Sequence, residues 1–161
     1  MAVDAADPGD TRWLTETEMT AWRPYMVSTL RLRQRLHREL VEAHDVSLID
    51  YEVLAALSAT STGSMRMSEL AALLGSTKSR LSHQIGRMES AGYIRRGKDP
   101  EDKRGVTAEL TDNGVAVLRA AAPTHVAGVR AHMVDLLTDH EQAALGSAFT
   151  RVLSHLEDLD E

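Results

Sequence analysis

Apolar side chains recur at helical spacing along two long segments, one near each end of the chain. The N-terminal set comprises Met19, Trp22, Met26, Leu30, Leu36 and Leu40, and the C-terminal set comprises Leu145, Phe149, Val152, Leu156 and Leu159. Steps of three or four residues place such side chains on one face of an α-helix. Two long amphipathic helices are therefore predicted, and Pro24 in the first predicts either a kink near Tyr25 or a short separate first segment.

Polar residues mark where helices begin. Thr15 followed by Glu18, and Thr138 followed by Glu141, match the capping box, in which the two side chains satisfy backbone N–H groups of the first turn. The capping boxes therefore place the start of the two long helices near residues 16 and 139.

Three shorter helices are predicted after the first long one. Ser47 caps the first of them, which ends in the polar segment 58–63, and the next begins near Ser68. Ser76 is predicted to cap the third, which runs to Ala91. The second and third are joined by a turn that contains glycine, an arrangement typical of a helix-turn-helix.

The spacing of apolar residues changes from helical to alternating after the helix that ends at Ala91. Residues 93–96 and 106–110 each predict a strand, and the polar, turn-rich segment 97–105 between them predicts a hairpin with a long charged tip. Thr111 is then predicted to cap a fifth helix with a kink at Pro123. The predicted fold class is mainly α with a small β-hairpin wing: a winged helix-turn-helix domain flanked by long terminal helices.

Charge is distributed unevenly along the chain. The formal net charge is -6, but residues 76–104 contain eight basic and four acidic side chains, a local charge of +4 that leaves -10 for the remainder. A basic island in an acidic chain favours a local phosphate-binding surface, with a merely solvated charged face as the alternative.

Composition and missing motifs exclude several classes of protein. The chain contains no cysteine, which rules out disulfides, thiolate zinc sites and thiol-based peroxide sensing and fits a cytoplasmic location. The acidic N-terminus does not match a secretory signal, and no apolar run is long enough to span a bilayer, so no membrane partner is expected. Without a Gly-rich phosphate loop, Gly-x-Ser-x-Gly or His-Glu-x-x-His, an enzyme is not expected.

The fourth helix separates its side chains into two faces. Leu81, Ile85 and Met88 are predicted to face the core. Arg, His and Ser side chains on the remaining surface can hydrogen-bond base edges or phosphates in a major groove. The candidate DNA-binding residues of this segment are Ser76, Thr77, Lys78, Ser79, Arg80, Ser82, His83, Gln84 and Arg87. Gly86 indicates either close approach to the groove or a packing constraint.

The tip of the hairpin offers a second set of contacts. Lys98, Lys103 and Arg104 are candidates for the adjacent minor groove, where arginine is favoured by the enhanced negative potential. Asp102 is positioned to pair with Arg104 and fix its direction. Because such a pair is exposed to solvent, its value would lie in orientation rather than in stability.

Four segments resemble the multiple antibiotic resistance regulator (MarR) family. They are residues 67–74, residues 87–96, the hairpin segment Asp99-Pro100-Glu101-Asp102-Lys103-Arg104-Gly105, and Leu110-Thr111-Asp112-Asn113-Gly114. The pattern Asp-x-Arg-Gly followed by Leu-Thr-x-x-Gly is the most specific part, and the resemblance extends from about Thr15 to Leu159.

The resemblance implies a triangular homodimer that binds a pseudo-palindromic operator in double-stranded DNA. The fourth helix, about residues 77–91, would enter the major groove, and the wing, about residues 93–110, would place Arg104 in the minor groove. It also implies a repressor relieved by a small, phenolic or lipophilic effector, with no cofactor. The expected organisation is a disordered tail (1–12), an N-terminal dimerisation helix (13–46), the winged helix-turn-helix domain (47–110) and C-terminal dimerisation helices (111–161).

Family pockets lie where the dimerisation helices meet the DNA-binding domain. The candidates here are Trp13, Trp22, Tyr25, Met26, His37, Tyr51 and His125, although such residues on an apolar stripe are more often core. A metal-sensing regulator of the same fold is one alternative. The pairs His37/His44 and His125/His132 are each seven residues apart, which is about 10 Å along a predicted helix. Neither pair alone can therefore bind one ion. A winged-helix protein-interaction module without DNA binding is the other alternative.

Overall fold

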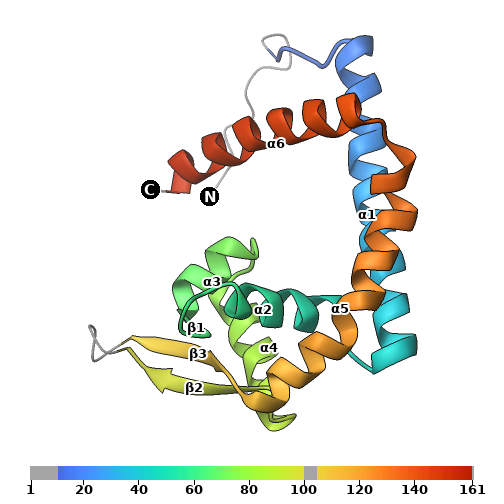
Figure 1. Ribbon diagram of the computed structural model, residues 1–161. Coiled ribbons are helices and arrows are strands. Elements are labelled where there is room, and N and C mark those ends of the chain that lie inside the picture. The colour runs from blue at the N-terminus through green and yellow to red at the C-terminus, as the bar shows by residue number, and fades with distance from the viewer. Residues whose placement is uncertain (1–10, 100–104, 161) are drawn as a thin grey trace.

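The computed structural model describes residues 11–99 and 105–160. The expected tail, apart from residues 11 and 12, therefore lies outside the described residues. The described elements follow one another as α1 (Glu16–His44), α2 (Leu48–Ser58), β1 (Ser64–Arg66), α3 (Met67–Leu73), α4 (Lys78–Ser90), β2 (Ile94–Lys98), β3 (Val106–Leu110), α5 (Asp112–His132), the 3-10 helix η1 (Val134–Leu136) and α6 (Asp139–Asp160). The predicted mainly helical fold with a small wing is confirmed (Figure 1).

The predicted capping residues begin their helices, with one exception. Thr15 and Glu18 form the expected capping box at α1, and Thr111 Oγ1 accepts from the Gly114 N–H at the start of α5. Pro24 lies inside an uninterrupted α1, so the expected separate first segment is wrong. A proline removes one backbone hydrogen bond, and the remaining bonds of a 29-residue helix keep it continuous.

The exception is the start of α4, where Thr77 and not Ser76 is the N-cap. Thr77 Oγ1 accepts from the Arg80 N–H at 3.3 Å. Ser76 is one residue too early because it still belongs to the end of α3: its N–H bonds to the Ala71 carbonyl at 2.8 Å, while Gly75 adopts a φ of +56°. This is the pattern by which a left-handed glycine closes a helix.

The wing is part of a three-stranded antiparallel sheet in the order β1-β3-β2. β2 and β3 form the predicted hairpin, with Ile94 opposite Leu110 and Lys98 opposite Val106. The sequence analysis missed β1, which pairs with β3 from Ser64 opposite Glu109 onward. Three residues with intermediate burial carry no alternation that a pattern could detect.

Two apolar clusters hold the described part of the chain together. One lies among α2, α3, α4 and the sheet and includes Leu54, Leu70 and Ile85, each 0% exposed. The other joins α1, α2 and α5 around Leu40 and Ala121, also 0% exposed. Figure 1 shows α5 running alongside α1 and α6 crossing the N-terminal half of α1, away from the sheet.

Large apolar side chains remain uncovered on α1 and α6. Those exposed by half or more are Trp22 (50%), Leu30 (65%), Val152 (50%), Leu153 (57%), Leu156 (51%) and Leu159 (68%). The ring centroids of Tyr25 and Phe149, one from each helix, lie 4.8 Å apart. Within the described ranges, no helix combines the length and the apolar character required to cross a membrane.

Candidate nucleic-acid interface

α4 lies on the core by the predicted face and presents basic side chains on the other. Leu81, Ile85 and Met88 are at most 2% exposed, and this buried stripe fixes the rotation of the helix. Of the predicted contact residues, Thr77, Lys78, Ser79, Arg80, His83 and Arg87 are exposed, while Ser76 and Ser82 are partly buried; Glu89 and Ser90 of α4 are exposed as well. Hydrogen-bond donors of this kind suit base edges and phosphates.

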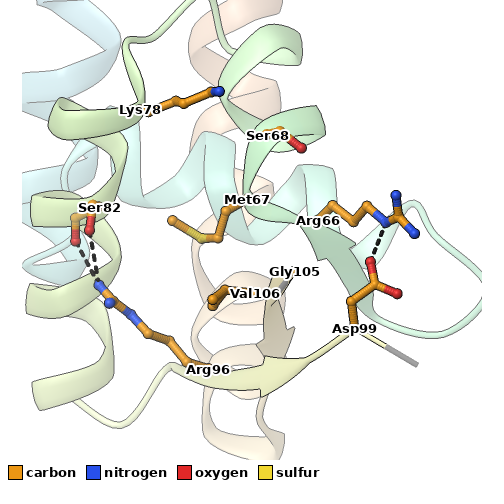
Figure 2. A pocket seen from close by; sticks show the side chains of 9 residues that line it. All are labelled: Arg66, Met67, Ser68, Lys78, Ser82, Arg96, Asp99, Gly105 and Val106. Carbon is orange, nitrogen blue, oxygen red and sulfur yellow. Dashed lines mark hydrogen bonds and ion pairs between the residues drawn. The ribbon is translucent and has the colours of Figure 1, made fainter. Parts of the chain in front are cut away.

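A hollow of about 370 Å³ separates α4 from the wing (Figure 2). Lys78 and Ser82 line it from α4, and Arg96 and Val106 line it from the two wing strands. Lys78 and Arg96 bring two positive charges to this hollow, so it is electrostatically suited to an anionic group.

Arg96 fastens the wing to α4. Its Nη2 donates to the Ser82 carbonyl oxygen at 2.9 Å, and its backbone N–H donates to Glu89 Oε1 at 3.2 Å. Gly86 lies beneath this guanidinium, since a Cβ at Gly86 would be 3.7 Å from Arg96 Nη2. Gly86 therefore lies against the wing, but 3.7 Å is an ordinary van der Waals distance, so the predicted packing constraint is not what requires a glycine here.

A second set of interactions stabilises the wing at the base of its tip. Asp99, 6% exposed, forms an ion pair with Arg66 of β1, and its N–H donates to the Gly105 carbonyl at 3.1 Å (Figure 2). Sequence reasoning did not include Arg66 and Arg96 among the candidate contacts, because only the paired strands bring them close to α4. The predicted contacts of Lys103 and Arg104 and the orienting role of Asp102 lie outside the described residues.

A second hollow of about 380 Å³ lies on the other side of α4, toward α1 and α2. Arg80, His83 and Arg87 line it together with Arg33 of α1 and Glu52 of α2. Arg33 donates to both carboxylate oxygens of Glu52, at 2.6 and 2.9 Å, and this hydrogen bonding raises the pKa of Arg33. The ion pair joins α1 to α2 beside α4.

Gln84 is the predicted contact residue that the structure removes from the surface. It is 6% exposed, and its amide bonds to Asp50 of α2 and to Arg87. The sequence did contain the signal, since Gln84 follows Leu81 by three residues and precedes Met88 by four, the spacing of the buried face. A direct DNA contact by Gln84 is therefore replaced here by an internal role.

The seven candidate pocket residues do not converge on one cavity. Tyr51 and His125 stack with ring centroids 4.3 Å apart between α2 and α5, and burial lowers the pKa of His125. His37 Nδ1 accepts from the Leu48 N–H at 3.3 Å. Trp13, Trp22, Tyr25 and Met26 lie exposed at or before the N-terminal half of α1, and neither hollow is lined by any of the seven.

The histidines lie in separate contacts rather than in a cluster. His44 Nε2 lies 2.7 Å from Thr124 Oγ1. His132 Nε2 lies 2.8 Å from Glu39 Oε1, and this hydrogen bond lowers the pKa of Glu39. Across the part of the chain that the structure describes, no three His, Cys, Asp or Glu side chains are grouped to hold a metal ion. The metal-sensing alternative thus has no candidate site there.

Comparison with known proteins adds to this geometry. A family model described as the MarR family matches residues 44–105, which contain α2, β1, α3, α4 and β2. A helix-turn-helix (HTH) type transcriptional regulator from Bacillus cereus is 30% identical over 123 residues, which are 76% of this chain and 80% of the relative.

Two solved structures from Streptomyces coelicolor are similar over nearly the whole chain. AbsC, a MarR family transcriptional regulator, is 41% identical with a TM-score of 0.84, over 92% of this chain and 99% of AbsC. Sco3205, a MarR family transcriptional regulator solved in complex with DNA, is 39% identical with a TM-score of 0.85, over 91% of this chain and 92% of Sco3205.

Proposed function

This chain belongs to the MarR family of winged-helix, DNA-binding transcriptional regulators, and on this premise we propose that it binds a pseudo-palindromic operator as a homodimer. α4 is the major-groove helix in this proposal, and the β2–β3 wing reaches the adjacent minor groove. The regulator acts as a repressor, and a small phenolic or lipophilic effector releases it from DNA.

The exposed basic face of α4 is the observation that carries the proposal. Lys78, Arg80 and Arg87 point away from a buried stripe that fixes the helix, and Lys98 is exposed on the neighbouring strand. The rest of the chain is strongly acidic, so this face is the one on which phosphates are attracted rather than repelled. The proposed DNA contacts are the candidate residues of α4 and the wing named in the sequence analysis, except Gln84.

The homodimer is proposed from the uncovered apolar faces of α1 and α6. Exposed apolar surface of this extent on two neighbouring helices favours burial against a second copy of the chain. A two-fold axis would then set two α4 helices about one turn of DNA apart, roughly 34 Å, and the operator would repeat its half-site with inverted direction. Residues 13–46 and 111–161 are the dimerisation segments in this arrangement.

The test is selection of duplexes from a random pool by the full-length protein, followed by titration of the selected duplex at two salt concentrations. We expect a palindromic consensus, selective binding over random duplex, and affinity that falls steeply as salt rises. Arg80→Ala is expected to weaken binding by about tenfold. Failure to enrich any sequence would contradict the proposal and favour a protein partner for the winged helix.

The effector is tested in the same assay. Phenolic carboxylates and longer apolar phenols are added to the preformed complex, and release of the selected duplex without unfolding of the protein is the expected outcome. Release by none of them would remove this class of effector from the proposal and leave the DNA-binding part unchanged.

A further inference from the structure

Gln84 is the polar side chain of α4 that the fold buries. It is 6% exposed, whereas Arg80, His83 and Arg87 on the same helix are exposed. Burying an amide is unfavourable unless its donor and its acceptor both find partners. An apolar residue at this position would fill the space at lower cost, so the reason for an amide must lie in the groups that it contacts.

Both ends of the Gln84 amide are bonded, and to groups of opposite character. Its Nε2 donates to Asp50 Oδ1 of α2, and its Oε1 accepts from Arg87 Nη2. A carboxylate only accepts hydrogen bonds and a guanidinium only donates them. The amide therefore has a single satisfied orientation, with its NH₂ group toward Asp50 and its carbonyl toward Arg87.

Asp50 is itself held in place at the start of α2. Its Oδ2 accepts from Ser47 Oγ at 2.5 Å, and Ser47 Oγ accepts from the Asp50 N–H at 3.1 Å. Both carboxylate oxygens are thus engaged, one by the cap of α2 and one by Gln84. The row Ser47, Asp50, Gln84 and Arg87 connects the N-terminus of α2 to the DNA-facing side of α4.

This row holds Arg87 without neutralising it. A direct ion pair with Asp50 would cancel the positive charge, whereas the neutral Gln84 carbonyl engages one N–H of the guanidinium and leaves its charge and its other donors available. An arginine that is already ordered loses less side-chain freedom when it binds.

We propose that Gln84 is a positioning residue that, anchored on Asp50, directs the Arg87 guanidinium toward the operator and thereby sharpens sequence selectivity. The inference rests on the proposed function. It assigns Gln84 no contact with DNA and makes α2 part of the recognition machinery.

The test is a double-mutant cycle between Gln84→Met and Arg87→Ala in the full-length protein, using the selected duplex and random duplex. Methionine has nearly the length of glutamine and removes both hydrogen bonds. We expect Gln84→Met to weaken binding of the selected duplex by about tenfold, the size of one hydrogen bond to a charged group. Binding of random duplex and its salt dependence should change little, because the net charge is unchanged.

The decisive comparison is the effect of Gln84→Met when Arg87 is already alanine. A residue that acts through Arg87 should then have an effect below about twofold, the usual limit of additivity between independent sites. Equal losses in both backgrounds, or no loss in either, would overturn the inference. Thermal unfolding of each variant shows whether the fold is retained. If Gln84 had a merely structural role, Gln84→Met would lower DNA affinity equally with arginine and with alanine at position 87.

The anchor is tested at Asp50 with a conservative and a disruptive variant. Asp50→Asn keeps an oxygen that accepts from Gln84 and should retain selective binding, whereas Asp50→Leu removes it and should match Gln84→Met. Unchanged selectivity in Asp50→Leu would contradict the anchoring role. If the unmodified protein selects no duplex, the proposed function fails; if it selects one and the cycle is additive, only this inference fails.

Discussion

Gly114 shows how tightly one residue can constrain the junction between the wing and α5. A Cβ at this position would lie 2.2 Å from the Tyr93 carbonyl oxygen and 2.9 Å from Leu110 Cδ1. The first of these atoms belongs to the backbone and cannot turn aside. Thr111 Oγ1 also donates to the Tyr93 carbonyl at 3.0 Å, so any shift there disturbs the cap of α5 as well.

We therefore expect Gly114→Ala to lower the free energy of unfolding by about 1–3 kcal/mol, as overpacking of a well-packed site does. Gly86→Ala is the matched control, because its Cβ meets only the end of the Arg96 side chain at 3.7 Å. Alanine is favoured over glycine in a helix by about 1 kcal/mol, so Gly86→Ala should be neutral or stabilising. Urea unfolding measures both, and equal losses would contradict this assignment.

The residue scale also shows where a sequence pattern stops being informative. Spacing predicted the buried stripe of α4 and, with it, the exposure of Arg80 and Arg87. The same spacing placed Gln84 on the buried side, but its polarity outweighed its position in the interpretation. Only its two partners, on α2 and on α4 itself, explain why an amide is stable there.

Among the elements, the wing depends on contacts that are distant in sequence. Asp99 pairs with Arg66, 33 residues earlier, and Arg96 reaches the Ser82 carbonyl on α4. Helix ends were predictable because their caps involve neighbours in sequence, as at Thr15 and Thr111. β1 and the ion pairs of the wing were not predictable, because they arise only when the sheet forms.

Asp99→Asn tests whether the base of the wing contributes to DNA binding through position. Removing a negative charge should by itself strengthen attraction to DNA. We nevertheless expect the affinity for the selected duplex to fall, by roughly threefold to tenfold, because the ion pair with Arg66 is weakened and the wing is less firmly held. Glu42→Gln on the exposed side of α1 makes the same charge change and serves as the control. Tighter binding by both variants would refute a positional role.

The packing of α5 on α2 is expected to depend on pH through His125. Burial lowers the pKa of His125 below its ordinary value of 6.5, so the unfolded chain takes up this proton first as the pH falls. The contribution of neutral His125 to the free energy of unfolding should therefore be complete above about pH 6.5 and be lost as the pH falls below this value. Tyr51 of α2 stacks on the ring, and the negative charge of Glu52, itself paired with Arg33 of α1, partly opposes the effect of burial on the pKa of His125.

His125→Phe keeps an aromatic ring against Tyr51 and removes the titrating group. The decrease in unfolding free energy between pH 7.5 and 5.5 should be smaller in this variant than in the unmodified protein. His140→Gln, on the exposed first turn of α6, should leave the decrease unchanged. An identical decrease in the His125 variant would show that other groups account for it.

At the scale of the whole molecule, the middle of the chain and its two terminal helices have different surfaces. The basic face of α4 lies within an otherwise acidic chain. α6 and the N-terminal half of α1, which carry exposed apolar side chains, lie away from the sheet (Figure 1). A single copy therefore leaves its apolar faces in water and contains one α4 helix, the helix that we propose to bind DNA. Pairing two copies through α1 and α6 would cover the apolar faces and bring two α4 helices into one particle.

Charged substitutions on α6 test this pairing in the full chain. Val152→Glu with Leu156→Glu places two carboxylates on a face whose side chains are 50% and 51% exposed, so the fold of one copy should survive. We expect light scattering to report about 35 kDa for the unmodified protein, twice the 17.7 kDa of one chain, and half of that for the variant. Affinity for the selected duplex should fall by at least about a hundredfold, because the two half-sites no longer bind as one ligand. Ser154→Glu, at an exposed polar position of the same helix, adds a carboxylate without removing an apolar side chain and serves as the control for charge. A double variant that stays dimeric, or that binds DNA as tightly when monomeric, would contradict the dimer.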